Sequence, residues 1–477
     1  MIGLIFGIII LAFVSVVLVR TINFKPQEKE TREVENIDFD YESAISNLQK
    51  LVKCKTISYF DHSLEDDKEF NKLVRMLPKL YPNVCKNLKL KKFDGRALLF
   101  YWKGKKKGDP AVFMAHYDVV PVEQDNWTKP AFDALIEDNI MWGRGTLDTK
   151  VTFNGVLSAG EHLLKKGFKP EHDIYFAFSG GEETNGPGAK NIVNYFKENN
   201  ITPSFVLDEG GAVVSGVFPG LKQPCGLIGI AEKGYINMTL SVKSSGGHAS
   251  APKPHTPIGV LAKAVSAIEA HPFKLQLTDP VLKMFDNLGR RSSFLYRMIF
   301  ANLWCFSWIL DILGRVNGGQ LNALMRTTVA FTQAKGSEAA NVIPPSASMT
   351  ANLRLSPADS VDSTINHIKE IINNKDIEIS LSDASEPSRI SVTDCDGFKW
   401  ISEAIEDTWQ GCVTAPYLMV QCSDSKNYGV ISDRVYRFSA SDLTNEEMNS
   451  IHGNDEHIRL ETIKKAVEFF IRVMKNC

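Results

Sequence analysis

Eight cysteines are scattered along this 477-residue chain, and they form neither a CxxC pair nor a dense cluster. This spacing argues against a disulfide scaffold and a thiolate metal site, so we expect most of them to be small buried hydrophobic residues. The chain also lacks a charge excess, because 54 basic and 56 acidic residues give a net charge of −2. We therefore expect no nucleic acid partner and no bulk electrostatic attraction to membranes. No G-x-S-x-G stretch is present, which argues against an enzyme with a nucleophilic serine elbow.

Charge is also absent from residues 1–19, a run that Arg20 closes. The run is long enough to cross a bilayer as a helix. It lacks the basic start, the shorter apolar core and the A-x-A-like site of a cleaved signal peptide. We therefore predict a transmembrane or signal-anchor helix over 1–19 and a polar linker over 20–37.

The orientation of this anchor stays open. The basic residues that follow it favour a cytoplasmic body. Three N-x-T triplets, at Asn126, Asn200 and Asn237, permit a lumenal location. We expect a membrane-anchored or secreted protein of the secretory pathway, the extracellular space or the vacuolar lumen, with undetermined topology.

Apolar strand-type runs alternate with helical patterns over the next part of the chain. Strands are predicted at 97–102, 111–120, 174–180 and 203–211, and helices at 41–54, 150–167 and 189–200. The alternation predicts an α/β fold, with a mixed, mostly parallel sheet covered by helices on both faces. In such sheets ligands lie beyond the carboxyl ends of the strands.

The pattern changes near residue 231. It then follows β-α-β-β-α-β, the order of a ferredoxin-like α+β domain, and α/β texture returns from 384. We predict a catalytic domain in two parts, 38–230 and 384–477, with an inserted domain over 231–383.

One segment of the insert, residues 293–313, is unusually apolar and is interrupted only by Arg297 and Asp311. It could pack in the core, line a binding site, form a dimer surface or face lipid. The sequence leaves these alternatives open.

Ionisable residues interrupt or follow the predicted strands. His116 and Asp118 are two positions apart in an apolar run, so on a strand they would share a face. Burying them without a partner costs on the order of 2–7 kcal/mol. Carboxylates follow the other strand ends, and a histidine comes late in the chain: Asp148, Glu182, Glu183, Asp208 and His452. Two histidines and several carboxylates in one crevice form an N/O ligand set that suits zinc, manganese or cobalt.

Each of these features alone has a simpler explanation. The G-R-G stretch at 143–145 could be only a turn, and the G-x-G-x-x-G spacing of a dinucleotide site fails at Asp148. Two adjacent glutamates usually form a solvated turn, and a single late histidine is more often a surface residue. The order of the features is more informative than any one of them.

Five short motifs stand in a fixed order along the chain. They are H-x-D (116–118), G-R-G-x-x-D-x-K (143–150), G-x-E-E (180–183), D-E-G (208–210) and H-G-x-x-E (452–456). The set resembles the co-catalytic zinc family of aminoacylase, carnosinase and carboxypeptidase S, over about residues 40–475. The stretches "MAHYDVVPV", "GRGTLDTK", "LDEGG", "GGHASAP" and "NVIPP" are similar to the carboxypeptidase S and N-fatty-acyl-amino-acid synthase/hydrolase branch. The resemblance implies a zinc-exopeptidase-like fold with an inserted lid domain, through which two copies could dimerise.

The resemblance also implies two Zn²⁺ per subunit, with Mn²⁺ or Co²⁺ as alternatives. His116 and Asp208 would hold one ion. Glu183 and His452 would hold the second ion, and Asp148 would bridge the two.

Three further residues take catalytic roles by the same resemblance. Asp118 would orient His116 through its other ring nitrogen. Glu182 would be the general base that moves a proton from water to the departing amine. His248 of the lid would reach the site of a dimer partner and stabilise the oxyanion.

The implied substrate is a small molecule with a free carboxylate, which Asn341 and Arg354 would hold. A planar guanidinium suits this task because it binds carboxylate bidentately. We predict a di-zinc amidohydrolase that cleaves, and could reversibly form, the amide of N-acyl amino acids, with long acyl chains preferred. A carboxypeptidase S-like enzyme for short peptides is the alternative, and a non-catalytic receptor on the same fold is a weaker one.

A few positions depart from the family pattern. Thr149 follows Asp148, where the family usually has Asp, which leaves open whether the strained peptide commonly found there is kept. Gly181 precedes Glu182 where a polar residue is frequent, and Ser423 and Lys426 differ from a T-D-S-R stretch. None of these changes removes an implied ligand or the base.

Overall fold

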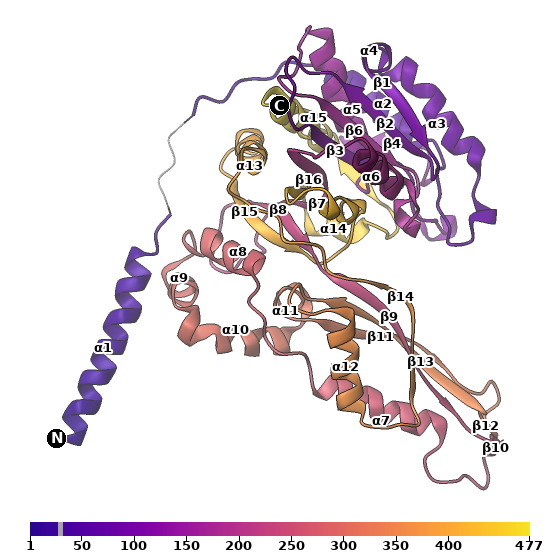
Figure 1. Cartoon of the computed structure of the whole chain (residues 1–477), viewed down its shortest axis with the longest axis vertical. Helices are drawn as coiled ribbons and strands as arrows, with labels where there is room; N and C mark the ends of the chain where they lie inside the picture. Colours follow the sequence, from indigo (N-terminus) through magenta and orange to yellow (C-terminus); the bar gives the residue numbers. More distant parts are fainter. Residues whose placement is uncertain (27–31) are drawn as a thin grey trace.

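A mixed eight-stranded sheet is the framework of the α/β part of the chain (Figure 1). The computed structural model describes residues 1–26 and 32–477. In order across the sheet, the strands are β1 (Lys89–Phe93), β2 (Ala97–Trp102), β6 (Ile174–Ser179), β3 (Ala111–His116), β7 (Phe205–Val214), β16 (Val435–Leu443), β8 (Cys225–Glu232) and β15 (Val413–Met419). Four of the seven neighbouring pairs are parallel, so the sheet is mixed and mostly parallel, as predicted.

Helices cover both faces of this sheet because alternate strand residues face two separate cores. Phe113 of β3 belongs to one core, and its neighbours Val112 and Met114 belong to the other. The first core is shared with α2 (Tyr41–Val52), α3 (Asp67–Leu80), α4 (Pro82–Asn87), α5 (Lys150–Lys165), α13 (Asp396–Thr408) and α15 (Leu460–Lys475). The second core is covered by α6 (Gly188–Glu198). The predicted α/β class is therefore confirmed.

A second, antiparallel sheet of four strands lies below the first in Figure 1, and two helices pack on it. Its elements in chain order are β9 (Gly234–Lys243), α7 (Pro257–Ala270), β11 (Thr328–Lys335), β13 (Ser346–Leu355), α12 (Val361–Ile372) and β14 (Glu378–Ser385). The strand order β11-β13-β9-β14 is that of a ferredoxin-like sheet, as predicted. Its far tip carries a two-stranded ribbon, β10 (Gly247–His248) with β12 (Val342–Ile343).

Four helices between α7 and β11 leave the small sheet. They are α8 (Asp279–Gly289), α9 (Phe294–Ala301), α10 (Leu303–Asn317) and α11 (Gly319–Met325). Their buried side chains share a core with β15 of the large sheet, including Met284 and Phe285 against Leu418. Part of the predicted insert therefore packs on the large sheet.

The remaining elements are small. A short helix α14 (Asn445–Ser450) precedes a three-stranded sheet of β17 (His457–Arg459), β5 (Ile140–Trp142) and β4 (Leu135–Glu137). These place the end of the chain beside the 142–150 loop, because Gly143 donates its N–H to the carbonyl of Glu456.

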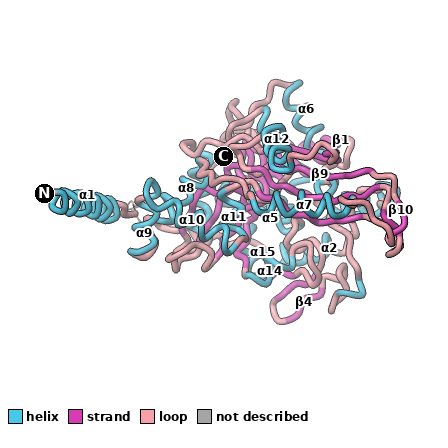
Figure 2. The backbone as a smooth tube through the Cα atoms, turned by 90° about the horizontal axis from the view of Figure 1, so that it is seen from below, coloured by secondary structure: helices cyan, strands magenta, loops and turns pink. Residues whose placement is uncertain are grey.

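The N-terminal helix α1 (Ile2–Asn23) projects away from the rest of the molecule and contacts it through its C-terminal half (Figures 1 and 2). Within the described residues it is the one single helix long and apolar enough to cross a membrane. The predicted linker, 20–37, lies partly outside the described residues, which omit 27–31. The part of the linker that follows contacts the α/β part of the chain, because Arg32 pairs with Glu403 at 2.6 Å.

The first polar motif differs from its predicted geometry. Strand β3 ends at His116, whereas a strand was expected through residue 120. The chain then turns toward the 56–58 segment, since Val119 donates to the carbonyl of Thr56 and accepts from the N–H of Ser58. Asp118 therefore follows the strand instead of lying on it.

Candidate active site

Two histidines from distant parts of the chain meet at one carboxylate. His116, at the end of β3, has its Nε2 3.0 Å from Oδ1 of Asp148. His452, in the loop after α14, has its Nε2 2.7 Å from Oδ2 of the same residue. Asp148 precedes α5 and presents one oxygen to each imidazole, so it stands between two adjacent donor sets.

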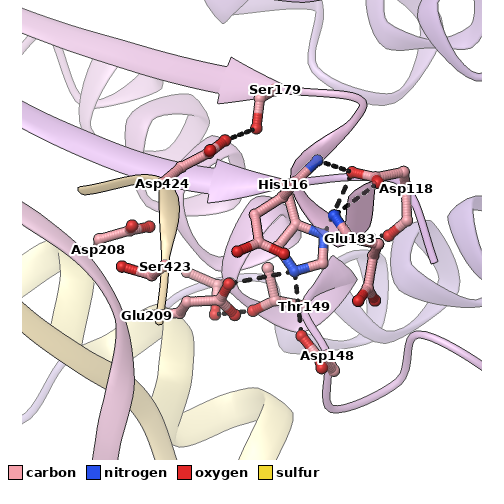
Figure 3. Close-up of polar contacts among 12 residues, drawn as sticks. His116, Asp118, Asp148, Thr149, Ser179, Glu183, Asp208, Glu209, Ser423 and Asp424 are labelled. Carbon is pink, nitrogen blue, oxygen red and sulfur yellow. Dashed lines mark hydrogen bonds and ion pairs between the residues drawn. The ribbon is translucent and has the colours of Figure 1, made fainter. Parts of the chain in front are cut away.

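A second carboxylate completes each set. Glu209 Oε1 lies 3.1 Å from Nε2 of His116 (Figure 3), and Glu183 Oε2 lies 3.1 Å from Nε2 of His452. Glu183 lies in a short 3₁₀ turn, Glu182–Thr184, directly after β6. The strand ends of the sheet thus bring these side chains together, as expected for this kind of fold.

Asp118 supports both halves of this arrangement. Its backbone carbonyl lies 3.0 Å from Nδ1 of His116, and its carboxylate Oδ1 lies 3.4 Å from the same nitrogen. The carboxylate also accepts from the backbone N–H groups of Glu182 and Glu183, at 3.2 Å each, and from the hydroxyl of Ser58 at 2.8 Å. Fully buried, Asp118 fixes the ring of His116 and the turn that carries both glutamates.

The 142–150 loop is held by a residue from the late motif. Glu456, fully buried, accepts from the backbone N–H groups of Gly145 and Leu147 at 3.0 and 2.7 Å. Arg144 pairs with the same carboxylate at 2.6 Å. The peptide bond between Asp148 and Thr149 is cis, so the special peptide that the sequence left open is present here.

Burial and nearby negative charges raise the pKa values of three glutamates in this cluster. Burial raises the pKa of Glu182 well above its ordinary value and raises the pKa of Glu183 as well. Burial also raises the pKa of Glu209 to about 8. For Asp148, burial is outweighed by the two imidazoles, which lower its pKa.

The same contacts raise the pKa of both histidines. Hydrogen bonds to Asp148 and Glu183 raise the pKa of His452 to about 10. Burial alone would lower the pKa of His116, but Glu209 and the neighbouring aspartates outweigh it and raise that pKa. Without a cation, this cluster therefore retains protons that a bound cation would displace.

The donor atoms fit a metal ion. Two overlapping groups of three residues each offer one donor atom per residue, and the three atoms lie within 4.8 Å of one another. The groups are His116–Asp148–Glu183 and His116–Glu182–Glu209. Among the described residues, Oε1 of Glu183 is buried and has no hydrogen-bond partner. A buried carboxylate oxygen in this position needs a partner such as a cation, and imidazole with carboxylate suits zinc.

Asp208, the predicted ligand, lies apart from this cluster. Its Oδ2 accepts from the N–H of Ser425 at 3.0 Å, and Figure 3 shows it on the side of Ser423, away from His116. Its neighbour Glu209 occupies the place predicted for it. The geometry therefore points to Glu209 instead of Asp208 beside His116.

Asp424 is a second acidic residue that the sequence did not reveal as part of the site. It is buried, it accepts a short hydrogen bond from Ser179 at the end of β6, and burial raises its pKa to about 7. The D-E-G motif was a signal for Glu209, since this motif contains both acidic residues. The T-D-S-R-like stretch at 423–426 was a signal for Asp424, because this residue is the aspartate of that stretch.

The lid residues do not join the cluster within one chain. His248 and Asn341 lie side by side at the far tip of the small sheet, where Ala249 donates to the carbonyl of Asn341 (Figure 1). His248 is exposed and bonds Ser250 at 2.8 Å. This tip is well separated from β3 and β7, so His248 cannot complete the site of its own chain in this arrangement.

Arg354 lies at the opposite end of β13 from this tip, next to the large sheet. Its guanidinium lies 5.9 Å from the ring centre of Tyr235, and Lys426 lies 5.4 Å from the same ring. Lys426 also donates to Asn185, directly after the 3₁₀ turn that carries Glu183. Two positively charged side chains, Arg354 and Lys426, thus lie at the junction of the two sheets, close to the candidate site.

A family comparison agrees with this geometry. The profile of peptidase family M20/M25/M40 matches residues 112–476. The chain belongs to this family. It is therefore a hydrolase of the metallopeptidase type.

Named relatives align over nearly the whole chain. A probable carboxypeptidase S-like 2 from Dictyostelium discoideum is 37% identical, over 98% of this chain and 92% of that protein. The N-fatty-acyl-amino acid synthase/hydrolase PM20D1 of Xenopus tropicalis is 32% identical, over 98% and 93%.

Solved structures share the fold at low sequence identity. An M20 family metallo-carboxypeptidase, Sso-CP2 from Sulfolobus solfataricus, aligns with a TM-score of 0.65 and 19% identity, over 91% of this chain and 98% of that one. Human carnosine dipeptidase 1 aligns with a TM-score of 0.63 and 13% identity, over 91% and 96%. These likenesses support the fold.

Proposed function

We propose that the chain is a di-metal amidohydrolase that cleaves an amide bond next to a free α-carboxylate. The observation that carries this proposal is Asp148, whose two oxygens face His116 and His452 at 3.0 and 2.7 Å. A carboxylate shared in this way is placed to bridge two ions. The six groups that the proposed reaction would use are all present, which disfavours a non-catalytic receptor: His116, His452, Asp148, Glu182, Glu183 and Glu209.

The ligands divide into two sets around Asp148. His116 with Glu209 would hold one ion, and His452 with Glu183 would hold the other. Zn²⁺ is the proposed metal, and Mn²⁺ or Co²⁺ would fit the same N/O donors. When bound, two such ions supply Lewis acidity that polarises the scissile carbonyl and lowers the pKa of water toward about 7.

Glu182 acts as the general base. Its neighbour Glu183 is a ligand, and the turn that holds both is fixed by Asp118 through two backbone N–H groups. Burial keeps the pKa of Glu182 raised, which suits a group that first accepts and then donates a proton near neutral pH. Glu182 takes a proton from water and passes it to the departing amine.

Recognition of the substrate's carboxylate falls to Arg354. Its planar guanidinium sits at the junction of the sheets, and Lys426 adds a second positive charge across Tyr235. His248 and Asn341 act in the site of a second copy, since their tip is separated from the cluster of their own chain. This role makes the protein a homodimer through the small sheet.

N-fatty-acyl amino acids are the proposed substrates. Support comes from the relative named N-fatty-acyl-amino acid synthase/hydrolase, which aligns over 98% of this chain. Because hydrolysis is reversible, high fatty acid would drive condensation at the same site. The carboxypeptidase S-like relative favours short peptides as the alternative.

A direct comparison of substrates tests this choice. The full-length protein loaded with Zn²⁺ is given N-oleoyl glycine and a plain dipeptide, and kcat/KM is measured for each. We expect the oleoyl compound to be cleaved faster, and Arg354→Ala to raise KM for both because both carry a free carboxylate. Faster cleavage of the dipeptide would favour the carboxypeptidase alternative.

The helix α1 is the proposed membrane anchor. It has 22 residues, and no charged side chain precedes Arg20. A helix of this length spans about 33 Å, close to the thickness of a bilayer core. Nearly all its side chains are exposed in the described structure, so a lipid environment would cover them.

A further inference from the structure

The helices α9 and α10 form an exposed apolar surface that the proposed reaction does not use. We call it the α9–α10 surface. Its large exposed side chains include Phe294, Leu295, Trp304, Trp308, Ile312 and Val316. Trp304 and Trp308 are 58% and 59% exposed, which is unusual for the largest apolar side chains of a folded protein.

The exposed residues of α10 share one face of the helix. Trp304, Trp308 and Ile312 are spaced by four positions, so they lie along one stripe. Leu310 and Gly314, on the opposite side, are buried against the body. The helix is therefore fixed by one face and leaves the other open.

The surface carries little charge. Between residues 294 and 317 the sequence has three charged residues. Asp311 is the one acidic residue, and it is paired with Arg315 and Arg326. Arg297 lies over the ring of Phe294, at 5.7 Å from its centre. No unpaired negative charge in this segment opposes contact with lipid.

The junction of α9 and α10 is attached to the proposed anchor. Asn302 donates its side-chain amide to the carbonyl of Val17 at 3.3 Å and to the hydroxyl of Thr21 at 3.2 Å. Arg20 donates to the carbonyl of Ala301 at 3.2 Å. These contacts hold the junction at the C-terminal end of α1, where its uncharged stretch ends.

Trp304 of α10 contacts α1 one turn nearer to the N-terminus of α1 than Asn302 does. Its ring packs edge-on against Phe13, with 5.7 Å between the ring centres. Phe13 is seven residues before Arg20, which is about 10 Å along a helix. Since α1 projects away from the body (Figures 1 and 2), Trp304 lies on the bilayer side of Arg20.

The two helices together have the apolar length of a membrane segment but not its shape. Together they are long and apolar enough for a span, yet the chain bends by 112° between them. A bent pair cannot cross a bilayer as one rod. It can lie in the interface, where amphipathic helices bury their apolar face by about 5–10 Å.

We propose that the α9–α10 surface dips into the leaflet that α1 enters and forms a second, interfacial membrane contact. The inference rests on the proposed anchor, and its occupant is the lipid bilayer. Tryptophan favours this zone because its ring is apolar and its N–H can reach water. The contact would hold β15 and the rest of the large sheet at the membrane surface, since α8 links α9 to that sheet.

Tryptophan quenching in vesicles tests the proposal. The full-length protein is reconstituted into phosphatidylcholine vesicles that contain lipid brominated either near the headgroup or near the chain end. The helix α1 contains no tryptophan, so the signal does not report on the anchor itself. We expect quenching that is stronger with bromine near the headgroup, and its loss in the double variant Trp304→Phe with Trp308→Phe.

Trp400→Phe is the matched control, since Trp400 lies on α13 and packs, partly buried, against the large sheet's core. It should keep the quenching of the wild type. If the protein floats with the vesicles but shows no quenching that depends on Trp304 and Trp308, the surface does not contact lipid, and the anchor alone stands. If the protein does not float, both the anchor and this inference are contradicted. Neither readout depends on catalytic activity, so neither tests the proposed reaction.

Discussion

Asp208 and Glu209 are neighbours on β7, at a point where the register with β16 shifts between Asp208 and Gly211. One of them faces His116. Glu209 does so at 3.1 Å, while Asp208 accepts from the N–H of Ser425. The proposed metal site depends on this choice, and the two residues offer a matched pair of variants.

We expect Glu209→Gln to bind one metal ion per chain in place of two and to lower kcat/KM by at least about 100-fold, because outer partners of ligands alone cost 10–100-fold. Asp208→Asn keeps an oxygen that can accept from Ser425, so it should retain both ions. Metal content by elemental analysis and hydrolysis rates check this. The reverse pattern would make Asp208 the ligand.

The pKa shifts predict how zinc changes stability with pH. Burial raises the pKa of Glu209 to about 8, so the metal-free folded state keeps a proton that the unfolded chain loses near pH 4.5. Hydrogen bonds raise the pKa of His452 to about 10 from 6.5, so its contribution is present below pH 6.5 and declines above it. Both groups make the metal-free protein less stable as pH rises from 5 to 8.

Bound zinc replaces these protons, so we expect it to raise Tm more at pH 8 than at pH 6. Thermal unfolding of the chelated and the zinc-loaded protein at both values measures the difference. An equal or smaller zinc effect at pH 8 would contradict the proposed ligands.

At the scale of elements, a buried ion pair joins two neighbouring strands of the large sheet, β16 and β8, where the chain leaves for the small sheet. Arg437 of β16 lies 2.5 Å from Glu232, the last residue of β8, and both are 1% exposed. Glu232 also accepts from the hydroxyls of Ser423 and Ser425, at 3.1 and 3.0 Å. These strands therefore share one polar network under the site.

Removing one partner leaves the other charge buried and unpaired. We expect Arg437→Met to lower the free energy of unfolding by about 3–5 kcal/mol. Arg434→Met, which breaks an exposed pair with Asp433, should cost less than about 1 kcal/mol. Urea unfolding of both variants measures these free energies. Equal losses would mean that the buried pair contributes no more to stability than the exposed pair does.

The periodicity of apolar residues made the helices and strands predictable from sequence, but contacts between distant segments did not follow from it. Strand β2 coincides with the predicted 97–102 run, and the β-α-β-β-α-β order gave the small sheet. The end of β3 was missed because Val119 bonds a segment 61–63 residues earlier. The position of Glu209 beside His116 was not predicted, because both residues of the D-E-G motif are acidic and the register shift of β7 against β16 is not visible in the sequence.

At the scale of the molecule, the small sheet holds His248 away from the cluster of its own chain, and the prediction from sequence was that it serves the site of a partner chain. The proposed dimer resolves this separation by placing the tip of one chain at the site of its partner. Such a site is built from two chains, so two differently inactivated chains can complement each other.

We expect His248→Ala and Glu182→Gln each to be inactive alone, and their mixture after subunit exchange to recover about a quarter of wild-type activity, since half of the dimers then hold one complete site of two. His271→Ala, an exposed histidine at the end of α7, should behave like the wild type. Absence of recovery in a mixture that contains heterodimers would show that His248 does not act in the partner's site.

The central claim is that two metal ions and Glu182 together perform the hydrolysis. Glu182 also belongs to one of the two donor sets, so its role as base has to be separated from a role as ligand. The decisive measurement is the turnover and metal content of Glu182→Gln beside the wild type, each after chelation and zinc add-back. We expect both proteins to bind two Zn²⁺ per chain, and the variant to turn over about 10²–10⁴-fold more slowly. Wild-type activity that survives chelation, or a variant that turns over as fast as the wild type, would contradict the account.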